Sequence, residues 1–359
     1  MRVIVVGAGV AGASVAHHLS RAGVATVLVD QDLPGQATAA GAGIVCPWSS
    51  RVTDPEFEKL ADAAADYYPA LADELGEIGY RRVGALRLVS DDSVLPAVTA
   101  RCAGSTLAGS PTLLDPDEAR KLFPPLRDDM AAVHIPGGAR VDGRLLRDAL
   151  RRSAGDHGAA LVFGAAKLVA DGSRVVGVDV DGQRISGDVV VVAAGAWTTA
   201  LLAPIGVDVA VAPQRGQITH LVLTGVDTSA WPVVLPPSSH YLLAFDGGRI
   251  VVGATRETGA GFDYRVTAAG QAEVLTEALS VAPGLGAASL LETRIGFRPA
   301  GPDRLPLLGR VPGVDGLVVL TGLGPSGLML GPLAGKVAAS LALGETPEID
   351  VAPFDPLRS

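Results

Sequence analysis

Three glycines near the start of the chain, Gly7, Gly9 and Gly12, have the G-x-G-x-x-G spacing of a dinucleotide-binding fingerprint. They follow the β-branched run 3–6, which is typical of a strand buried on both faces, and they open an apolar helical stripe. A second apolar strand then ends in Asp30. This order of strand, glycine turn, helix, strand and acid is the arrangement that binds a pyrophosphate and a ribose.

Each fingerprint residue has an expected role. Gly7 permits a tight turn, Gly9 lets the backbone approach a pyrophosphate, and Gly12 allows close packing of helix on strand. The N–H groups at the helix N-terminus face the phosphates. Asp30 accepts hydrogen bonds from the ribose hydroxyls and disfavours a 2′-phosphate. A plain strand–helix–strand unit with an acidic loop is the alternative interpretation.

Three later glycine-rich stretches indicate that the cofactor is long. Residues 37–50 are glycine-rich, and the small residues at 39–43 permit a second close backbone approach, although an ordinary loop would look the same. Segments 187–201 and 316–330 each run from a buried strand through a glycine turn into a helix. Ligands of open α/β sheets bind at such strand ends. An NAD-binding protein would continue with further strand–helix units and would explain neither of the last two segments.

Composition narrows the class of protein. The chain has 359 residues, of which 48% are hydrophobic and 19% charged, so it can bury a large core. Its net charge of −9 argues against a nucleic-acid partner. Cys46 and Cys102 have no metal-ligand spacing, and no metal site is expected. Glycines and prolines interrupt the uncharged runs 189–207 and 316–335, so we expect no membrane span and a cytoplasmic protein.

The elements around these motifs alternate between helix and strand. Residues 53–79 are predicted to form a long amphipathic helix capped by Thr53 or Asp54. Residues 80–90 are predicted to form a strand, 142–155 a helix, and 160–194 successive strands.

In order and spacing, the motifs resemble those of the flavoprotein superfamily of D-amino acid oxidase, glycine oxidase, sarcosine oxidase and D-amino acid dehydrogenase. The resemblance covers nearly the whole chain. It is carried by the fingerprint, by "VVVAAGAW", "PQRGQ" and "HYLLAFDGGRIVVGATRE", and by "GFRPAGPDRLPLLGR" and "LTGLGPSGLMLGPLAGKVAASL". Members like glycine oxidase and D-amino acid dehydrogenase are the most similar branches.

The resemblance implies an α/β fold in which a discontinuous, Rossmann-like FAD domain is interleaved with an α+β substrate domain on a mixed or antiparallel sheet. The expected FAD-binding segments are 1–80, 140–210 and 295–359, and the expected substrate-binding segments are 81–139 and 211–294. It implies non-covalent FAD and oxidation of the CH–NH bond of an amino acid or secondary amine, by hydride transfer to flavin N5. The imine formed then hydrolyses. The expected cofactor-binding residues are Gly7, Gly9, Val10, Ala11, Gly12, Asp30, Gln31, Ala40, Gly41, Gly43, Ile44, Ala194, Gly195, Trp197, Gly322, Gly324, Pro325, Ser326, Gly327 and Leu328.

Two residues are expected to meet the substrate. Arg298 lies in a "G-x-R-P" segment that matches the family's carboxylate-binding arginine, and a guanidinium holds a carboxylate bidentately. A structural arginine paired with Asp303 is the alternative. Tyr241 matches a tyrosine that donates a hydrogen bond to the carboxylate, and a core or rim tyrosine is equally compatible. His240 is expected on the opposite face of that strand.

Several other residues near these motifs are expected to have no direct role in catalysis. The family's last loop often carries a second polar residue, an arginine in glycine oxidase, where this chain has Pro325 and Ser326. This departure favours the dehydrogenase-like branch. Covalent flavin attachment to Cys46 is improbable, and Cys102 is expected in a polar loop. Structural or domain-interface roles are expected for Arg215 and Arg256, and packing or solvent-facing roles for His17 and His18.

Two alternatives to a free-standing amine oxidoreductase remain. One is an FAD-dependent tailoring enzyme that acts on a modified or carrier-bound amine. The other is a flavin-binding subunit of a heteromeric amine dehydrogenase, and a homo-oligomer is also compatible with the sequence. The substrate side chain, its stereochemistry and the electron acceptor are not encoded in these motifs.

Overall fold

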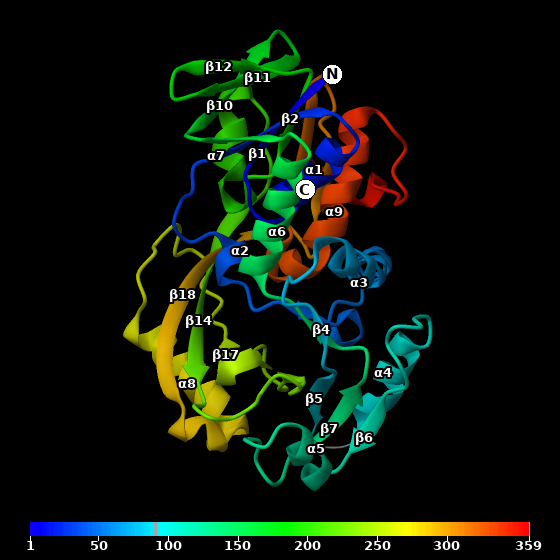
Figure 1. Cartoon of the computed structure of the whole chain (residues 1–359), viewed down its shortest axis with the longest axis vertical. Coiled ribbons are helices and arrows are strands. Elements are labelled where there is room, and N and C mark those ends of the chain that lie inside the picture. The colour runs from blue at the N-terminus through cyan, green and yellow to red at the C-terminus, as the bar shows by residue number, and fades with distance from the viewer. Residues whose placement is uncertain (90–91, 359) are drawn as a thin grey trace.

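The structure, a computed structural model, describes residues 1–89 and 92–358. One half of the elongated molecule is built on a six-stranded sheet and the other on an eight-stranded sheet (Figure 1). The long strands β14 (Ala212–Val222) and β18 (Ser289–Ala300) pair along their length and extend from the second half toward the first.

The six-stranded sheet has the order β19-β20-β13-β1-β2-β9. Its strands are parallel except for β19, which pairs antiparallel with β20. Its strands are β1 (Arg2–Val6), β2 (Ala25–Asp30), β9 (Ala160–Phe163), β13 (Val189–Val192), β19 (Leu307–Arg310) and β20 (Leu317–Thr321). The four central strands are rich in Val, Ile and Leu, as expected for strands covered on both faces.

Three helices pack together beside this sheet: α1 (Val10–Arg21), α6 (Gly143–Asp156) and α9 (Gly327–Leu343). Helix α1 is buried over most of its surface because it lies against both α6 and α9. It follows the fingerprint glycines directly, and Gly23 beyond its end has a φ of 75°. The predicted strand–helix–strand unit is therefore present, with the helix ending where the sequence indicated.

The eight-stranded sheet has the order β18-β14-β17-β16-β15-β5-β7-β6. It is antiparallel except for the parallel pair β15 and β5, so it is mixed, as predicted. Its remaining strands are β5 (Ala85–Val89), β6 (Thr112–Leu114), β7 (Ala131–Ile135), β15 (Val233–Leu235), β16 (Tyr241–Ala244) and β17 (Arg249–Gly253). Helices α5 (Pro116–Leu122) and α8 (Ala268–Val281) contribute to the apolar cluster on one face of this sheet.

Smaller elements complete the fold. The three-stranded sheet β10-β11-β12 packs against the six-stranded sheet, and β3-β8-β4 is a second three-stranded sheet. Their bounds, with those of the other helices, are α2 (Ala37–Ala40), β3 (Ile44–Val45), α3 (Pro55–Leu75), β4 (Arg81–Arg82), α4 (Leu95–Cys102), β8 (Ala139–Arg140), β10 (Ala166–Asp171), β11 (Arg174–Val180), β12 (Gln183–Ser186) and α7 (Thr198–Leu202).

The predicted elements are present with adjusted ends. Helix α3 is capped by Asp54, whose Oδ1 accepts hydrogen bonds from the backbone amides of Glu56 and Phe57 at 2.8 and 3.2 Å. The strand predicted over 80–90 is split into β4 and β5 around Gly84, and its last residue, Ser90, lies outside the described residues.

The α/β fold with a mixed second sheet is the one expected from the resemblance. The division into FAD and substrate segments stays a prediction, and its boundary at 295 falls inside β18.

Residues 324–343 are apolar and long enough to cross a membrane by length and composition alone. Within the fold, 72% of this stretch is buried. It packs against α1, where Ser14 donates a hydrogen bond to the carbonyl of Pro332 at 2.6 Å. Burial against other helices explains the apolar composition of α9 as that of a core helix.

Candidate active site

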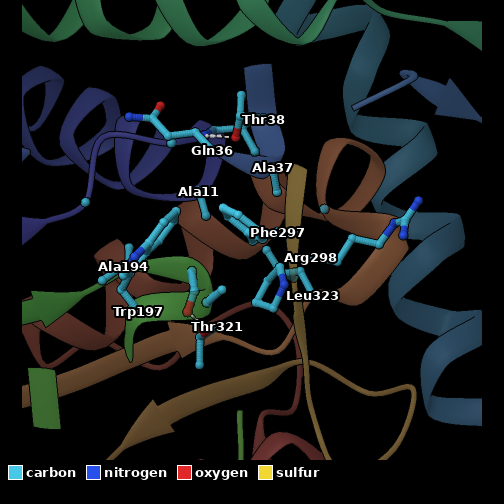
Figure 2. A pocket seen from close by; sticks show the side chains of 18 of the residues that line it. Ala11, Gln36, Ala37, Thr38, Ala194, Trp197, Phe297, Arg298, Thr321 and Leu323 are labelled. Carbon is cyan, nitrogen blue, oxygen red and sulfur yellow. Dashed lines mark hydrogen bonds between the residues drawn. The ribbon is translucent and has the colours of Figure 1, made fainter. Parts of the chain in front are cut away.

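A cavity of about 660 Å³ lies between the carboxyl ends of the parallel strands and the ends of β14 and β18. Residues from Val6 to Met329 line it, so it draws on almost the whole chain. Figure 2 shows Gln36 and Thr38 on one side of this cavity and Ala194, Trp197 and Thr321 on another.

The fingerprint glycines form the tight turn that was predicted. Gly7 has a φ of 103°, and a Cβ there would collide with the carbonyl of Ala193. A Cβ on Gly12 would collide with the carbonyl of Gly7, so Gly12 allows the close packing of helix on strand. The buried hydroxyl of Thr38 accepts a hydrogen bond from the Val10 amide at 3.0 Å. The first turn of α1 therefore faces the cavity, where its amides suit a phosphate.

Asp30 stands at the end of β2 on the cavity wall. Its carboxylate accepts hydrogen bonds from the backbone amide of Ala8 and, at 2.6 Å, from that of Asp32. The side-chain amide of Gln36 donates to it at 3.4 Å. These contacts hold the carboxylate beside the fingerprint turn, which is the place required for contact with ribose hydroxyls.

An apolar slot extends the cavity beyond Asp30, and the sequence motifs did not reveal it. The backbone leaves β9 at Gly164, whose amide donates to the carbonyl of Asp30 at 3.0 Å, and then enters β10. The slot is lined by Gly164, Ala166, Lys167, Leu168, Ala200, Leu201 and Pro204. This mostly apolar part of the cavity wall, next to Asp30, suits an aromatic base such as adenine.

The N-terminal end of α9 closes the other end of the cavity. Gly324, Pro325, Gly327 and Leu328 line it, together with Met329. The N-cap residue Ser326 makes no side-chain capping hydrogen bond. The first amides of α9 and the positive end of its dipole are therefore directed toward this part of the cavity, where they would stabilise negative charge on a reduced flavin.

Most of the predicted cofactor residues come together in this cavity. Three do not line it: Gly12 packs inside the fingerprint turn, Gly322 packs on Leu307, and Ser326 lies at the helix cap. The residues that line the cavity as predicted are Gly7, Gly9, Val10, Ala11, Asp30, Gln31, Ala40, Gly41, Gly43, Ile44, Ala194, Gly195, Trp197, Gly324, Pro325, Gly327 and Leu328.

Both cysteines lie away from the cavity lining. Cys46 is 4% exposed, and burial raises the pKa of its thiol to about 11. Cys102 is the last residue of α4 and is buried, so the expectation that it lies in a polar loop was wrong. Polar residues lie near Cys102 in the sequence, but the end of α4 packs Cys102 into the hydrophobic core.

Arg298 lies on β18 with only 9% of its surface exposed. Its Nη1 donates to the carbonyl of Thr255 at 2.9 Å. Within the described residues it has no carboxylate partner, and Asp303, the alternative partner, pairs instead with Arg358. A buried, uncompensated guanidinium in a cavity is suited to bind an anionic ligand.

Tyr241 begins β16 and also lines the cavity. Its ring lies over Gly253 on the neighbouring strand, with its hydroxyl 3.0 Å from the position that a Cβ of Gly253 would take. Burial raises the pKa of the Tyr241 hydroxyl, and the charges of Arg298 and Arg256 oppose this rise. The phenol therefore stays protonated and can donate a hydrogen bond.

The neighbouring His240 points elsewhere, as strand alternation predicted. Its ring lies 3.4 Å from a carboxylate oxygen of Glu273 and 3.7 Å from one of Glu277, both on α8. His17 is fully buried against Ser153 and Glu74, and the His18 ring contacts the hydroxyl of Tyr67 at 3.0 Å. All three histidines therefore have packing roles outside the cavity.

Arg256 and Arg215 were both expected to have structural or domain-interface roles. Arg256 lines the cavity near Tyr241, and its Nη1 donates to the carbonyl of Ser239 at 3.0 Å. Arg215 does have the structural role, because it pairs with Glu257 and, at 2.7 Å, with Asp263. Among the described residues, no group of three or more His, Cys, Asp or Glu side chains is arranged to hold a metal ion.

The site thus joins a turn suited to a dinucleotide to a pocket that contains two arginines, as in nucleotide-dependent oxidoreductases. The model of the family "DAO: FAD dependent oxidoreductase" matches residues 2–341, and the chain belongs to this family. It is therefore an enzyme that uses FAD, bound non-covalently, to oxidise an amine or amino acid. The lining of the cavity fits this cofactor: the fingerprint turn would hold the pyrophosphate, and the residues beside Asp30 would hold the adenine.

Individual relatives agree with this assignment. The chain is 49% identical to the structure of iminodiacetate oxidase from Chelativorans sp. BNC1, with a TM-score of 0.97 and 99% of each chain covered. It is 46% identical to an uncharacterised oxidoreductase, YurR, of Bacillus subtilis, over 98% of both chains. It is 34% identical to a glycine oxidase of Pseudomonas aeruginosa, over 99% of this chain and 98% of that one. The departure at Pro325 and Ser326 therefore coexists with whole-chain similarity to a glycine oxidase.

Proposed function

We propose that the enzyme oxidises a carboxymethyl amine, that is, a substrate with the unit N–CH₂–COO⁻. The observation that carries this proposal is the buried Arg298, which has no carboxylate partner among the described residues and faces the cavity beside Tyr241. Glycine and iminodiacetate, from which two similar proteins take their names, share this unit.

Two side chains position the substrate in this proposal. The guanidinium of Arg298 pairs with the carboxylate, and the hydroxyl of Tyr241 donates a second hydrogen bond to it. Together they fix the CH₂ group at the junction between the cationic pocket and the dinucleotide cradle. Orientation of this kind is a major part of what the protein contributes, because it replaces a random encounter with one fixed geometry.

When bound, FAD supplies the oxidising power by accepting two electrons and a hydrogen from the substrate. The substrate loses a hydrogen with its electron pair from the CH₂ carbon and a proton from nitrogen, so a C=N bond forms. Water then adds to this imine and the C–N bond breaks, which gives glyoxylate and the amine. Arg298 and Tyr241 hold the carboxylate throughout and take no proton.

The first test is anaerobic reduction of the purified holoenzyme. Glycine, sarcosine (N-methylglycine), iminodiacetate, D-alanine and D-proline are added separately, and the flavin absorbance is followed. Bleaching by at least one carboxymethyl amine, with glyoxylate as product, is expected. Bleaching by D-alanine or D-proline alone would contradict this proposal, because their α-carbon carries a substituent, and would indicate an α-substituted amino acid as the substrate. No bleaching by any compound would favour a carrier-bound substrate or a missing partner subunit.

We also propose the division into FAD-binding and substrate-binding segments given above and a cytoplasmic location. Two buried free thiols support a reducing compartment. We propose that the single chain is active without another subunit. Gel filtration of the active enzyme tests this point and gives the oligomeric state.

A further inference from the structure

The main chain at Thr255 supports the guanidinium of Arg298. Nη1 of Arg298 donates a hydrogen bond to the carbonyl of Thr255 at 2.9 Å. Arg298 lines the cavity (Figure 2), whereas Thr255 does not. Whatever holds Thr255 in place therefore also helps to fix the direction in which Arg298 meets a ligand.

Thr255 is tied to β14 by its side chain as well as by its main chain. It follows the end of β17, and its amide donates to the carbonyl of Gln217 at 3.3 Å. Its hydroxyl accepts a hydrogen bond from the amide of Gln217 at 3.0 Å. Thr255 and Gln217 are both fully buried, so no water competes for these groups.

A carboxylate fixes the proton of the Thr255 hydroxyl. This hydroxyl donates to Oε1 of Glu257 at 2.7 Å. Burial would raise the pKa of Glu257, but hydrogen bonds from Arg215, Gln217 and Thr255 outweigh burial and hold that pKa below its ordinary value. An ionised carboxylate only accepts hydrogen bonds, so the hydroxyl directs its proton at Glu257 and keeps its lone pairs for the Gln217 amide.

Two residues of β14 anchor Glu257 in turn. Nε of Arg215 donates to its Oε2 at 3.1 Å, and the side-chain amide of Gln217 donates to its Oε1 at 2.8 Å. Arg215 and Gln217 flank Gly216, so their side chains leave β14 on the face opposite the one that Arg298 covers. Thr255 thus joins the two faces of the sheet, with its hydroxyl in this network and its carbonyl on Arg298.

We propose that Thr255 is a positioning residue for substrate binding: its hydrogen bonds to Gln217 and Glu257 hold the carbonyl that orients Arg298 toward the substrate carboxylate. The inference rests on the proposed function, because Arg298 must be the group that binds the carboxylate. Orientation before binding lowers the entropic cost of ordering the side chain. Without the hydroxyl, the buried amide of Gln217 would lack its acceptor, and Thr255 would shift together with the guanidinium.

Binding of an inert ligand tests this role independently of catalysis. Methoxyacetate has an ether oxygen where a carboxymethyl amine has nitrogen, so it cannot form an imine. It is titrated into the holoenzyme while the flavin spectrum or the heat of binding is measured. Thr255→Val removes the hydroxyl and nearly keeps the side-chain volume, and it should weaken binding about 5- to 20-fold, part of the effect of one charged hydrogen bond. Thr255→Ser keeps the hydroxyl and should bind within about twofold of wild type.

Thr219→Val is the matched control. Thr219 is fully buried on β14, but its hydroxyl contacts the side chains of Gln271 and Thr293. The substitution removes the same hydroxyl group from the same sheet, so it should lower the thermal unfolding midpoint as Thr255→Val does and leave methoxyacetate binding unchanged. Equal weakening of binding in the two variants would reveal a general effect of destabilising the sheet and would overturn the inference.

A double-mutant cycle shows whether Thr255 acts through Arg298. In the Arg298→Gln background, Thr255→Val should change the remaining affinity by less than about twofold. An equal loss in both backgrounds would overturn the inference, as would binding within about twofold of wild type in Thr255→Val alone. Either result leaves Arg298 as the carboxylate ligand if Arg298→Gln itself weakens binding.

The same cycle separates this inference from the proposed function. Wild-type affinity for methoxyacetate in Arg298→Gln would contradict the proposed role of Arg298 and the inference with it. If Thr255→Val does not fold, Glu257→Gln takes its place in the cycle, because a neutral amide is a weaker acceptor for the Thr255 hydroxyl. Its loss of affinity should likewise disappear in the Arg298→Gln background.

Discussion

The guanidinium of Arg298 lies directly over the α-carbon of Gly216. Both of its terminal nitrogens are 2.6 Å from the position that a Cβ of Gly216 would occupy. The two residues lie on the paired strands β14 and β18, where Gly216 is opposite Gly296. Because Gly216 has no side chain, the guanidinium of Arg298, which we propose binds the substrate, can lie close against the backbone of β14.

Gly216→Ala should displace Arg298 without removing it. We expect KM for the substrate to rise about 10-fold or more, because a charged hydrogen-bonded pair loses its geometry. The flavin spectrum should be unchanged. Gly155→Ala, at a helix position where an added Cβ meets no neighbour, is the control and should leave KM as in wild type. An unchanged KM in Gly216→Ala would show that the position of Arg298 over this glycine does not matter for binding.

Tyr241→Phe should weaken substrate binding by about 10-fold through the loss of one hydrogen bond to a carboxylate. Because we propose that the phenol is a hydrogen-bond donor and not a base, we expect kcat to fall by less than KM rises. Steady-state kinetics on glycine or iminodiacetate would separate the two effects. A large fall in kcat with an unchanged KM would instead place Tyr241 in the chemical step.

Thr38→Val removes the hydroxyl that accepts a hydrogen bond from the buried amide of Val10, and it keeps the shape of the side chain. We expect the free energy of unfolding to fall by about 1 kcal/mol, the usual cost of losing a helix N-terminal hydrogen bond. FAD should bind more weakly because the first turn of α1 is less firmly held. Thr38→Ser keeps the hydroxyl and should restore both properties. Identical unfolding midpoints for the two variants would contradict this role.

Acidification should destabilise the protein through His220. This residue is 2% exposed, and burial, followed by the charge of Arg294, lowers its pKa to about 4. The unfolded chain binds a proton near pH 6.5, so stability is lost as the pH falls from 6.5 toward 4. His220 alone should make the free energy of unfolding about 2 kcal/mol lower at pH 5 than at pH 7. The stability difference between pH 7 and pH 5 should therefore be smaller in His220→Phe. An equal difference in variant and wild type would exclude His220 as its source.

Local patterns were sufficient for the cradle and for the fold class. The fingerprint turn, Asp30 and the end of α9 were predicted because each is a contiguous motif whose geometry follows from glycine positions and strand–helix order. Arg298 and Tyr241 were found through the family resemblance, and the structure places both on the cavity wall.

The residues that were missed become neighbours only through tertiary structure. Lys167 and Leu168 reach the cavity because the backbone leaves β9 beside Asp30, which no local motif specifies. Arg256 follows the end of β17, where strand alternation no longer determines which way a side chain points. Whether Arg256 has a carboxylate partner also depends on which Asp and Glu residues the fold brings near it, and the sequence alone does not show this.

The residues that line the cavity run from Val6 to Met329 in the sequence. The six-stranded sheet beside it also includes β20, which pairs with β13 next to β1. During synthesis, the fingerprint emerges from the ribosome long before α9, whose first turn lies at the other end of the cavity. A nascent chain that holds the fingerprint alone has only one side of the nucleotide site, so we expect FAD to bind after α9 has been made and has packed against α1.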